Sequence, residues 1–497
     1  MEKQAINLNW LDIPTFWNWM ESASEFRLDA DAEQAVKRCH DYLVQRAAAG
    51  GEPVYGVDTG FGDLASTRIP AADLGELQRR ILLSHACGVG EPVPAELVRA
   101  MLLTKSLSLS KGHSGIAPTT LQRLLDMYNA GVLPIVPSQG SLGASGDLAP
   151  LAHLVLPLLG EGEVQFRGER MPASAALDRL GWKPLTLGAK EGLALINGTQ
   201  LMLSYGLMGL RRAERLADWA DALAAWSLEA WHGRAEPFTE HIHRIRNASG
   251  AMRVAGHVRS WLEGSVQQQE PRTQVQDPYS FRCVPQVHGA SRDTMTHVRS
   301  VFEAELNAVT DNPLVFPEED LILSGGNFHG QPLALALEAL GLAVHELASI
   351  SERRIFKLMS GRHGLPPFLT AKPGLNSGLM IPQYTAASLV SQNKQLTTPA
   401  AADTIDSSNG QEDHVSMGAN GALKLWRMLD NAEHVLAIEC LSASTAMELR
   451  GTKGMAPRLH ALQQSLRDVV PHHEEDVWLA PVIAEVKRWM DSQDLAN

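Results

Sequence analysis

Four long stretches of the chain repeat apolar residues at the spacing of an α-helix and contain no proline. They cover about residues 199–232, 286–310, 333–358 and 416–450. Each is much longer than the average helix of about 11 to 12 residues. The third stretch is apolar on nearly all sides, and a helix of that kind lies inside a bundle or at a subunit interface. The sequence therefore predicts a mainly α fold built as a bundle of long helices.

Strands and loops are expected to fill the remaining chain. Strand-like alternation is scarce, and the best example is Glu163–Phe166, which we expect to form one arm of a hairpin. Glycine concentrates at 55–62 and 140–146, and loops of this kind often carry functional sites. No repeat or linker marks a boundary. We place it between a loop-rich N-terminal part, 1–230, and a long-helix part, 231–497.

Composition excludes several classes of partner. The chain has 497 residues, of which 44% are hydrophobic and 20% charged, and its formal net charge is −13. That balance is typical of a well-packed protein and offers no basic surface for nucleic acid or an anionic membrane. No secretory signal and no run of 18 apolar residues is present. Four widely separated cysteines favour a reducing compartment. We expect a cytoplasmic protein with no nucleic-acid or membrane partner.

The densest cluster of small residues is Gly140–Pro150. It lacks the lysine of a phosphate-binding loop, and Ser145 is followed directly by Gly146, which excludes the Gly-x-Ser-x-Gly elbow of hydrolases. Backbone chemistry remains: the Gly146 nitrogen could attack the Ala144 carbonyl. Loss of two waters, one from the Ser145 side chain, would then leave a methylidene-imidazolone electrophile. A plain tight loop is the alternative interpretation.

The segment Gly140–His153 resembles the signature of the histidine and aromatic amino acid ammonia-lyases. Further blocks that resemble this family follow in matching order and spacing. They are Tyr55–Gly62, Leu83–Ala86, Leu195–Gln200, Gln276–Cys283, Gly325–Pro332 and Gln411–Gly418.

The resemblance implies an answer to the two difficulties of removing ammonia from an α-amino acid. The amino group must become a leaving group, and an unactivated β-hydrogen must be abstracted. For the first, the family implies 4-methylidene-imidazol-5-one, formed autocatalytically from Ala144, Ser145 and Gly146, as the electron sink. For the second it implies Tyr55 as the base, with Tyr279 as a second phenol near the group. A phenol has a pKa of about 10, so its pKa must be depressed or its proton must pass along a relay.

The same resemblance assigns the residues that bind. Asn197 and Gln276 correspond to the amides that hold the prosthetic oxygen and the substrate. Arg282 corresponds to the arginine that grips the substrate carboxylate, for which a planar two-pronged donor suits the geometry. Phe328 corresponds to the aromatic residue that faces the ring or the prosthetic group. A structural salt bridge for Arg282 and a core position for Phe328 are the alternatives.

Two positions bear on the choice of substrate. His85 and Glu412 are similar to the pair that contacts an imidazole ring in histidine ammonia-lyases, and a carboxylate opposite an imidazole N–H makes a charge-assisted hydrogen bond. We therefore expect conversion of L-histidine to trans-urocanate. His85 could also hold a phenol, so L-tyrosine giving p-coumarate stays open, as does a related aminomutase.

The chain departs from the family pattern at two places. Thr398 precedes Pro399 where histidine-specific members have a His-Pro pair. Asp58 stands where the family mostly has asparagine, and its charge would raise the pKa of Tyr55. The first departure weakens the choice of histidine as the substrate.

The resemblance also implies a homotetramer whose active sites combine loops from more than one subunit, with no external cofactor or metal. A metal-dependent hydrolase is the competing class. Its ligands would be His241 and His243, or the cluster His472–Asp476, but neither has a His-Glu-x-x-His frame.

Overall fold

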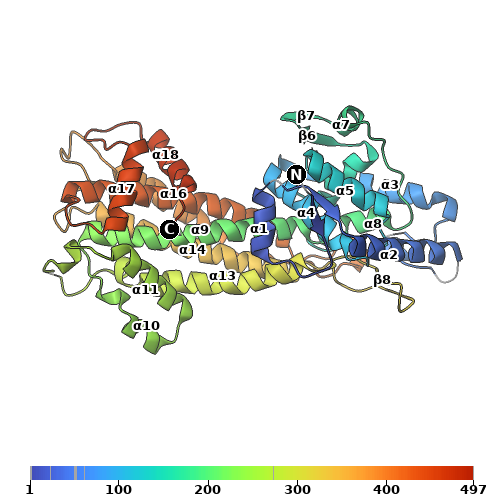
Figure 1. The fold of residues 1–497 in the computed structure, drawn as a ribbon, viewed down its shortest axis with the longest axis horizontal. Helices are drawn as coiled ribbons and strands as arrows, with labels where there is room; N and C mark the ends of the chain where they lie inside the picture. The colour runs from blue at the N-terminus through green and yellow to red at the C-terminus, as the bar shows by residue number, and fades with distance from the viewer. Residues whose placement is uncertain (1–2, 23, 50–52, 61, 273, 496–497) are drawn as a thin grey trace. The chain divides into compact units, whose positions relative to one another are not determined.

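The computed structural model describes residues 3–22, 24–49, 53–60, 62–272 and 274–495. The fold is mainly α, as the helical periodicity predicts, and its strands are short (Figure 1).

All four long helices predicted from the apolar repeat are present. Their ends differ from the predicted ends by a few residues, because capping and loop residues rather than the apolar repeat decide where a helix stops. They are α9 (Gln200–Trp231), α13 (Val284–Leu306), α14 (Gln331–Leu358) and α16 (Gly418–Arg450).

Helix α14 is the one that the sequence marks as apolar on nearly all sides. By length and hydropathy alone it could cross a membrane, but 61% of its most apolar window is buried inside the protein. An apolar helix covered in this way is a core helix of a bundle.

The chain divides into two compact units, each discontinuous in sequence. The first unit comprises Met1–Met208, Arg299–Glu338 and Pro399–Leu423. The predicted division at residue 230 separates two continuous parts of the sequence instead, and it stays a prediction. The second unit comprises Gly209–Val298, Ala339–Thr398 and Lys424–Asn497.

The first unit is built around α4, which is buried along almost its whole length and packs against α5 and α2. Helix α5 begins with Pro118, whose missing N–H costs nothing in a first turn, and stops at Gly131 in the left-handed conformation. The helices of this unit, apart from the long ones, are α1 (Ile13–Glu21), α2 (Ala30–Ala49), α3 (Leu74–His85), α4 (Ala95–Ser110), α5 (Pro118–Ala130), α6 (Leu148–Val155), α7 (Ala173–Leu180) and α8 (Glu191–Ile196), with short 3-10 helices η1 (Gly62–Ser66), η2 (Ala71–Asp73), η3 (Leu156–Leu159), η6 (Ala400–Ala402) and η7 (Ser408–Gly410).

The strands that the structure describes lie in this first unit and pair in small sheets. The predicted hairpin arm Glu163–Phe166 is β6, which pairs antiparallel with β7 and with β4 to make three strands in the order β4-β6-β7. Strands β1 and β2 pair in parallel, whereas β3–β5 and β8–β9 are antiparallel. Their bounds are β1 (Gln4–Ile6), β2 (Phe26–Leu28), β3 (Val89–Pro92), β4 (Leu133–Pro134), β5 (Pro137–Gln139), β6 (Glu163–Phe166), β7 (Glu169–Pro172), β8 (Leu314–Phe316) and β9 (Leu321–Leu323).

The regular elements described in the second unit are all helices, and loops connect them. Hydrogen bonds join its long helices through buried side chains, as when Ser227 on α9 donates to Glu439 on α16 at 2.7 Å. Its shorter helices are α10 (Glu240–Arg246), α11 (Ser249–Leu262), α12 (Tyr279–Arg282), α15 (Met380–Leu396), α17 (Pro457–Val469) and α18 (Leu479–Ser492), with η4 (Glu236–Phe238) and η5 (Gln267–Gln269).

Three helices of the first unit that pack on one another bring predicted site residues together. Helices α3, α6 and α8 make mutual contacts. His85 is the last residue of α3, Ser145 lies in the loop just before α6, and Asn197 is the C-cap of α8. Packing of these helix ends therefore gathers segments that are far apart in the sequence.

Candidate active site

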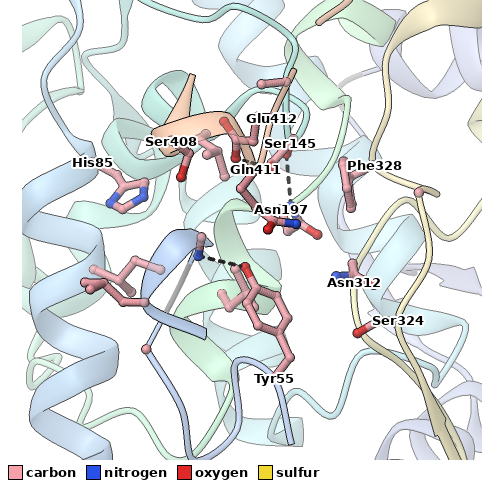
Figure 2. A pocket seen from close by; sticks show the side chains of 18 of the residues that line it. Tyr55, His85, Ser145, Asn197, Asn312, Ser324, Phe328, Ser408, Gln411 and Glu412 are labelled. Carbon is pink, nitrogen blue, oxygen red and sulfur yellow. Dashed lines mark hydrogen bonds between the residues drawn. The ribbon is translucent and has the colours of Figure 1, made fainter. Parts of the chain in front are cut away.

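A cavity of about 1070 Å³ opens among the loops of the first unit. Figure 2 shows Tyr55, His85, Ser145, Phe328 and Glu412 around it. The polar side chains that line it are Tyr55, Thr67, Arg80, Ser84, His85, Ser145, Asn197, Asn312, Ser324, His329, Ser408, Gln411, Glu412, Asp413 and His414.

Two hydrogen bonds hold Ser145, one at its backbone carbonyl and one at its hydroxyl. The side-chain amide of Asn197 donates to the Ser145 carbonyl at 2.9 Å. The Ser145 hydroxyl donates to Oε1 of Glu412 at 3.0 Å. Asn197 therefore holds the backbone of Ser145, and Glu412 holds its side chain (Figure 2).

The backbone after Ser145 permits only glycine. Gly146 has a φ of +76°, and a Cβ there would lie 2.1 Å from the carbonyl oxygen of Gly198. The two segments are tied further because the Asp147 N–H donates to that same Gly198 oxygen at 2.6 Å. The absence of a side chain at Gly146 therefore lets the segment before α6 lie directly against the one after α8.

Asp147 is completely buried beside this segment without a cationic partner in contact among the described residues. Its carboxylate accepts from the Met202 N–H at 3.0 Å and from the Ser141 hydroxyl at 3.2 Å. Burial outweighs these bonds and raises the pKa of Asp147 to about 7.

Tyr55 projects its hydroxyl into the cavity and accepts a hydrogen bond from the Gly62 N–H at 3.3 Å. Burial raises the pKa of Tyr55 and the charge of Glu412 raises it further, while the Gly62 N–H lowers it. Asp58 does not act as expected from its charge. Its carboxylate instead lies 3.4 Å from Arg68 and accepts from the backbone of its own loop.

His85 and Glu412 line the same cavity. His85 is half-buried, and its Nδ1 lies 3.0 Å from the Ser84 hydroxyl. Burial lowers the pKa of His85, although a bond to the Ile81 carbonyl and the charge of Glu412 act in the opposite direction. The second oxygen of Glu412 accepts from the Ser407 hydroxyl at 3.0 Å, which fixes the carboxylate between Ser407 and Ser145.

The comparisons with known proteins agree with this geometry. A family model described as aromatic amino acid lyase matches residues 11–468. The chain belongs to the aromatic amino acid lyase family. The histidine ammonia-lyase of Geobacillus thermodenitrificans is 50% identical over 472 residues, which are 94% of this chain and 93% of that protein. This chain is therefore a carbon–nitrogen lyase, of the class that works through a methylidene-imidazolone group.

Solved structures of the same family share the whole fold. The crystal structure of histidine ammonia-lyase from Trypanosoma cruzi has a TM-score of 0.91 and 39% identity, and the match covers 99% of this chain and 94% of that one. Tyrosine aminomutase from Streptomyces globisporus has a TM-score of 0.92 and 33% identity, covering 98% and 97%. The fold is therefore common to lyases and aminomutases and does not by itself separate them.

The residues present fit the prosthetic group of this lyase family. The group would form from Ala144, Ser145 and Gly146, and its ring carbonyl would be the Ser145 oxygen, which already accepts from Asn197. The Oδ1 of Asn197 is buried and accepts no hydrogen bond from the described residues, so it remains available to a bound molecule. Within those residues, no cluster of three or more His, Cys, Asp or Glu side chains could hold a metal.

Three predicted site residues of the lyase are not among the residues that line this cavity. Gln276, Tyr279 and Arg282 belong to the second unit, and none of them lines the cavity. Tyr279 and Arg282 lie on α12, where the Arg282 guanidinium lies 4.6 Å from the ring centre of Tyr279. The Tyr279 side chain is 70% exposed, and Arg282 Nε is buried without an acceptor among the described residues. Their roles in the site stay predictions.

Sequence reasoning missed two charged residues close to the tripeptide. Asp147 follows the tripeptide directly, and Lys105 is the single charged residue in an otherwise uncharged stretch, 100–110. The sequence signal for Lys105 is its isolation in an uncharged helical stretch, because a lysine buried in such a stretch needs a partner.

Proposed function

We propose that this lyase removes ammonia from L-histidine to give trans-urocanate. The observation that carries the proposal is that Glu412 and His85 line the same cavity as Ser145, so that groups suited to an imidazole stand beside the segment suited to become the electrophile. A carboxylate next to a ring N–H gives the charge-assisted bond that distinguishes imidazole from a phenyl ring. The named histidine ammonia-lyases at about half identity support the same substrate.

The proposal includes the prosthetic group formed from Ala144, Ser145 and Gly146. When present, this group supplies the electrophile that turns the amino group into a leaving group. The amide of Asn197 holds the Ser145 oxygen, and Phe328 covers one side of the cavity near it.

We assign removal of the β-hydrogen to Tyr55. Because burial raises the pKa of Tyr55, the phenolate is scarce at neutral pH, and turnover is expected to increase as the pH rises toward the alkaline range. Tyr55→Phe is expected to abolish turnover and to leave the ultraviolet absorbance of the prosthetic group intact. A variant that retains most of its rate would remove Tyr55 from the base role.

Gln276, Tyr279 and Arg282 complete the site in this proposal by coming from a neighbouring subunit of a homotetramer, with Arg282 binding the substrate carboxylate. The exposure of Tyr279 and the unpartnered Nε of Arg282 support such an arrangement. Light scattering tests the assembly, and a fully active monomer would contradict it. We also assign the lyase to the cytoplasm, since its four cysteines are all free.

The second candidate substrate is L-tyrosine, because the imidazole of His85 could bind a phenol. The first experiment supplies purified protein with L-histidine and L-tyrosine separately and follows the absorbance of the conjugated acrylate. Urocanate alone supports the proposal, and coumarate alone overturns it. A β-amino acid product, detected by chromatography, would identify an aminomutase.

Glu412→Gln sharpens this test. The change keeps the size of the side chain and removes its charge, so kcat/KM for histidine is expected to fall far more than kcat/KM for tyrosine. Ser145→Ala is the matched control that removes the prosthetic group and must abolish both activities. Equal losses on both substrates in Glu412→Gln would mean that Glu412 does not recognise the ring.

A further inference from the structure

Lys105 on α4 is a fully buried lysine close to the site. Its ammonium donates to the backbone carbonyl of Asn197 at 2.7 Å. In the part of the chain that the structure describes, no carboxylate lies within ion-pair distance of this ammonium; Asp311 and Asp147 act on it only from farther away.

Such an environment is costly for a lysine. An ammonium removed from water without an ion-pair partner destabilises the folded state, and burial lowers the pKa of Lys105 to about 7. An apolar residue of similar length would fit among the buried neighbours on α4 at no such cost. The lysine must therefore do something that packing alone does not require.

The peptide that Lys105 holds contacts the tripeptide twice. Asn197 directs its carbonyl to Lys105 and its side-chain amide to the Ser145 oxygen. The next carbonyl, that of Gly198, accepts from the Asp147 N–H, and Gly198 is also bridged to Gly146. Lys105 thus holds the Asn197 carbonyl, while the Asn197 side chain and the Gly198 carbonyl hold the backbone around Ser145.

We propose that Lys105 is a positioning residue for closure of the imidazolone ring from Ala144, Ser145 and Gly146. The inference rests on the proposed function, since it assumes that the ring forms. The Asn197 amide holds the oxygen that becomes the ring carbonyl, and Gly198 holds the chain just after Gly146. Both are placed by the bond from Lys105, so losing this bond loosens the geometry in which the ring closes.

The reaction that Lys105 favours balances without an oxidant. The Gly146 nitrogen forms a bond to the carbonyl carbon of Ala144. The Ala144 oxygen leaves as water with the protons of the Gly146 and Ser145 nitrogens. The Ser145 Cα–H and Cβ–Oγ bonds then break and release a second water.

The test measures intact mass, which reports the loss of two waters without any substrate. Lys105→Met is purified soon after brief induction and followed over time beside the wild type. Ring closure is expected to be slower by roughly tenfold or more, the effect of losing one hydrogen bond to a charged group. The fraction that has closed is expected to turn over histidine with nearly wild-type kcat per group formed. Closure at the wild-type rate would overturn the proposal.

Lys190→Met is the matched control. Lys190 is the other buried lysine near this region, but it is paired with Asp311 at 2.6 Å and bonds to the Ser114 carbonyl instead of to the tripeptide's neighbours. Its removal is expected to lower thermal stability while closure stays at the wild-type rate. Equal slowing in both variants at equal loss of stability would assign Lys105 a merely structural role and overturn the inference.

Two further results keep the test decisive. If Lys105→Met does not fold, Lys105→Gln, which stays polar but is too short to keep the bond, replaces it with the same expectation. If the wild type itself never loses two waters and matches Ser145→Ala in its ultraviolet spectrum, the proposed function fails, which is a different outcome from wild-type closure in the Lys105 variant.

Discussion

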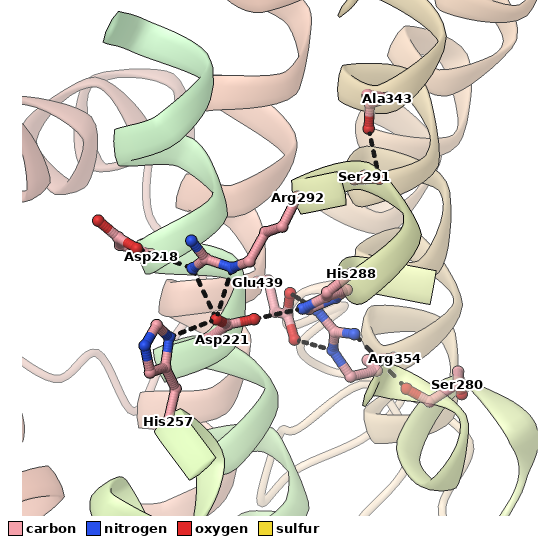
Figure 3. Close-up of polar contacts among 10 residues, drawn as sticks. All are labelled: Asp218, Asp221, His257, Ser280, His288, Ser291, Arg292, Ala343, Arg354 and Glu439. Atoms are coloured by element: carbon pink, nitrogen blue, oxygen red, sulfur yellow. Dashed lines mark hydrogen bonds and ion pairs between the residues drawn. The ribbon is translucent and has the colours of Figure 1, made fainter. Parts of the chain in front are cut away.

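Buried charges are treated differently in two regions of this lyase, the centre of the long-helix bundle and the surroundings of Ala144–Gly146. In the second unit, Arg354 and Glu439 are both fully buried and joined by two hydrogen bonds, at 2.5 and 2.8 Å (Figure 3). In the first unit, Asp147 and Lys105 are equally buried but contact neutral N–H, hydroxyl and carbonyl groups. Arg354 and Glu439 in the bundle therefore neutralise each other, whereas Asp147 and Lys105 beside the tripeptide contact only dipoles.

Asp221 extends the paired pattern in the second unit. Its carboxylate is contacted by Arg292 at 2.6 Å, His288 at 2.8 Å and His257 at 3.0 Å (Figure 3). Burial acts to raise the pKa of Asp221, but the hydrogen bonds from the two histidines and the charge of Arg292 hold it well below its usual range. The opposite shift at Asp147, to about 7, shows what burial does when no cation is in contact.

The largest expected effect comes from breaking the central ion pair. Arg354→Met leaves Glu439 buried without its cation, and the free energy of unfolding is expected to fall by about 3 to 5 kcal/mol. The double variant Arg354→Met/Glu439→Leu removes both charges and is expected to lose much less. Denaturant unfolding measures both, and a single variant as stable as the double would contradict the paired pattern.

The pH dependence of stability tests the claim that Asp147 is buried without a cation in contact. The pKa of Asp147 is about 7 in the fold and 3.8 in the unfolded chain, so the fold prefers the neutral carboxyl. The free energy of unfolding of the wild type is therefore expected to fall as the pH rises from about 4 to about 7. Asp147→Asn does not titrate, so its free energy of unfolding is expected to rise relative to that of the wild type by about 1 to 3 kcal/mol across that window. Thermal unfolding at several pH values measures the difference. A constant difference would show that Asp147 does not titrate in this range.

A smaller effect is expected at the edge of the paired network. His257 is 42% exposed and only one of three partners of Asp221, so His257→Ala is expected to cost about 0.5 to 1 kcal/mol of unfolding free energy. Denaturant unfolding measures this loss. A cost as large as that of Arg354→Met would mean that the network depends on its exposed member.

The smallest effect is expected for an exposed pair outside both groups. Lys37 and Asp41 lie one turn apart on α2 with 66% and 48% of their side chains exposed. Lys37→Gln is expected to change the unfolding free energy by less than about 0.5 kcal/mol. Denaturant unfolding measures the change. A larger loss would show that exposed ion pairs stabilise this protein as much as buried ones do.

Local patterns were enough to predict the long helices. The apolar repeat of α9, α13, α14 and α16 is long enough to exclude strands, and the alternation in β6 marks its hairpin. Helix α15 was not predicted, because only a few of its residues are buried and its sequence carries little apolar repeat.

The candidate site was predicted only in part. The small-residue segment around Ser145 identifies the chemistry, and the blocks that resemble the family supply Tyr55, His85 and Glu412. The sequence attributes a raised pKa of Tyr55 to Asp58, but the pKa is raised by burial and by the charge of Glu412. These causes could not be predicted, because a local pattern contains neither burial nor the distance to Glu412.

The sequence by itself determined the helical class, the family and the tripeptide Ala144–Gly146 that is proposed to form the electrophile, because each depends on neighbouring residues or on ordered blocks. Only the tertiary structure decided which charges meet. Ser145 and Glu412 are 267 residues apart, and Lys105 and Asn197 are 92 apart. Their bonds exist because helices and loops that are far apart in the sequence pack against one another, and that packing is a property of the folded chain as a whole.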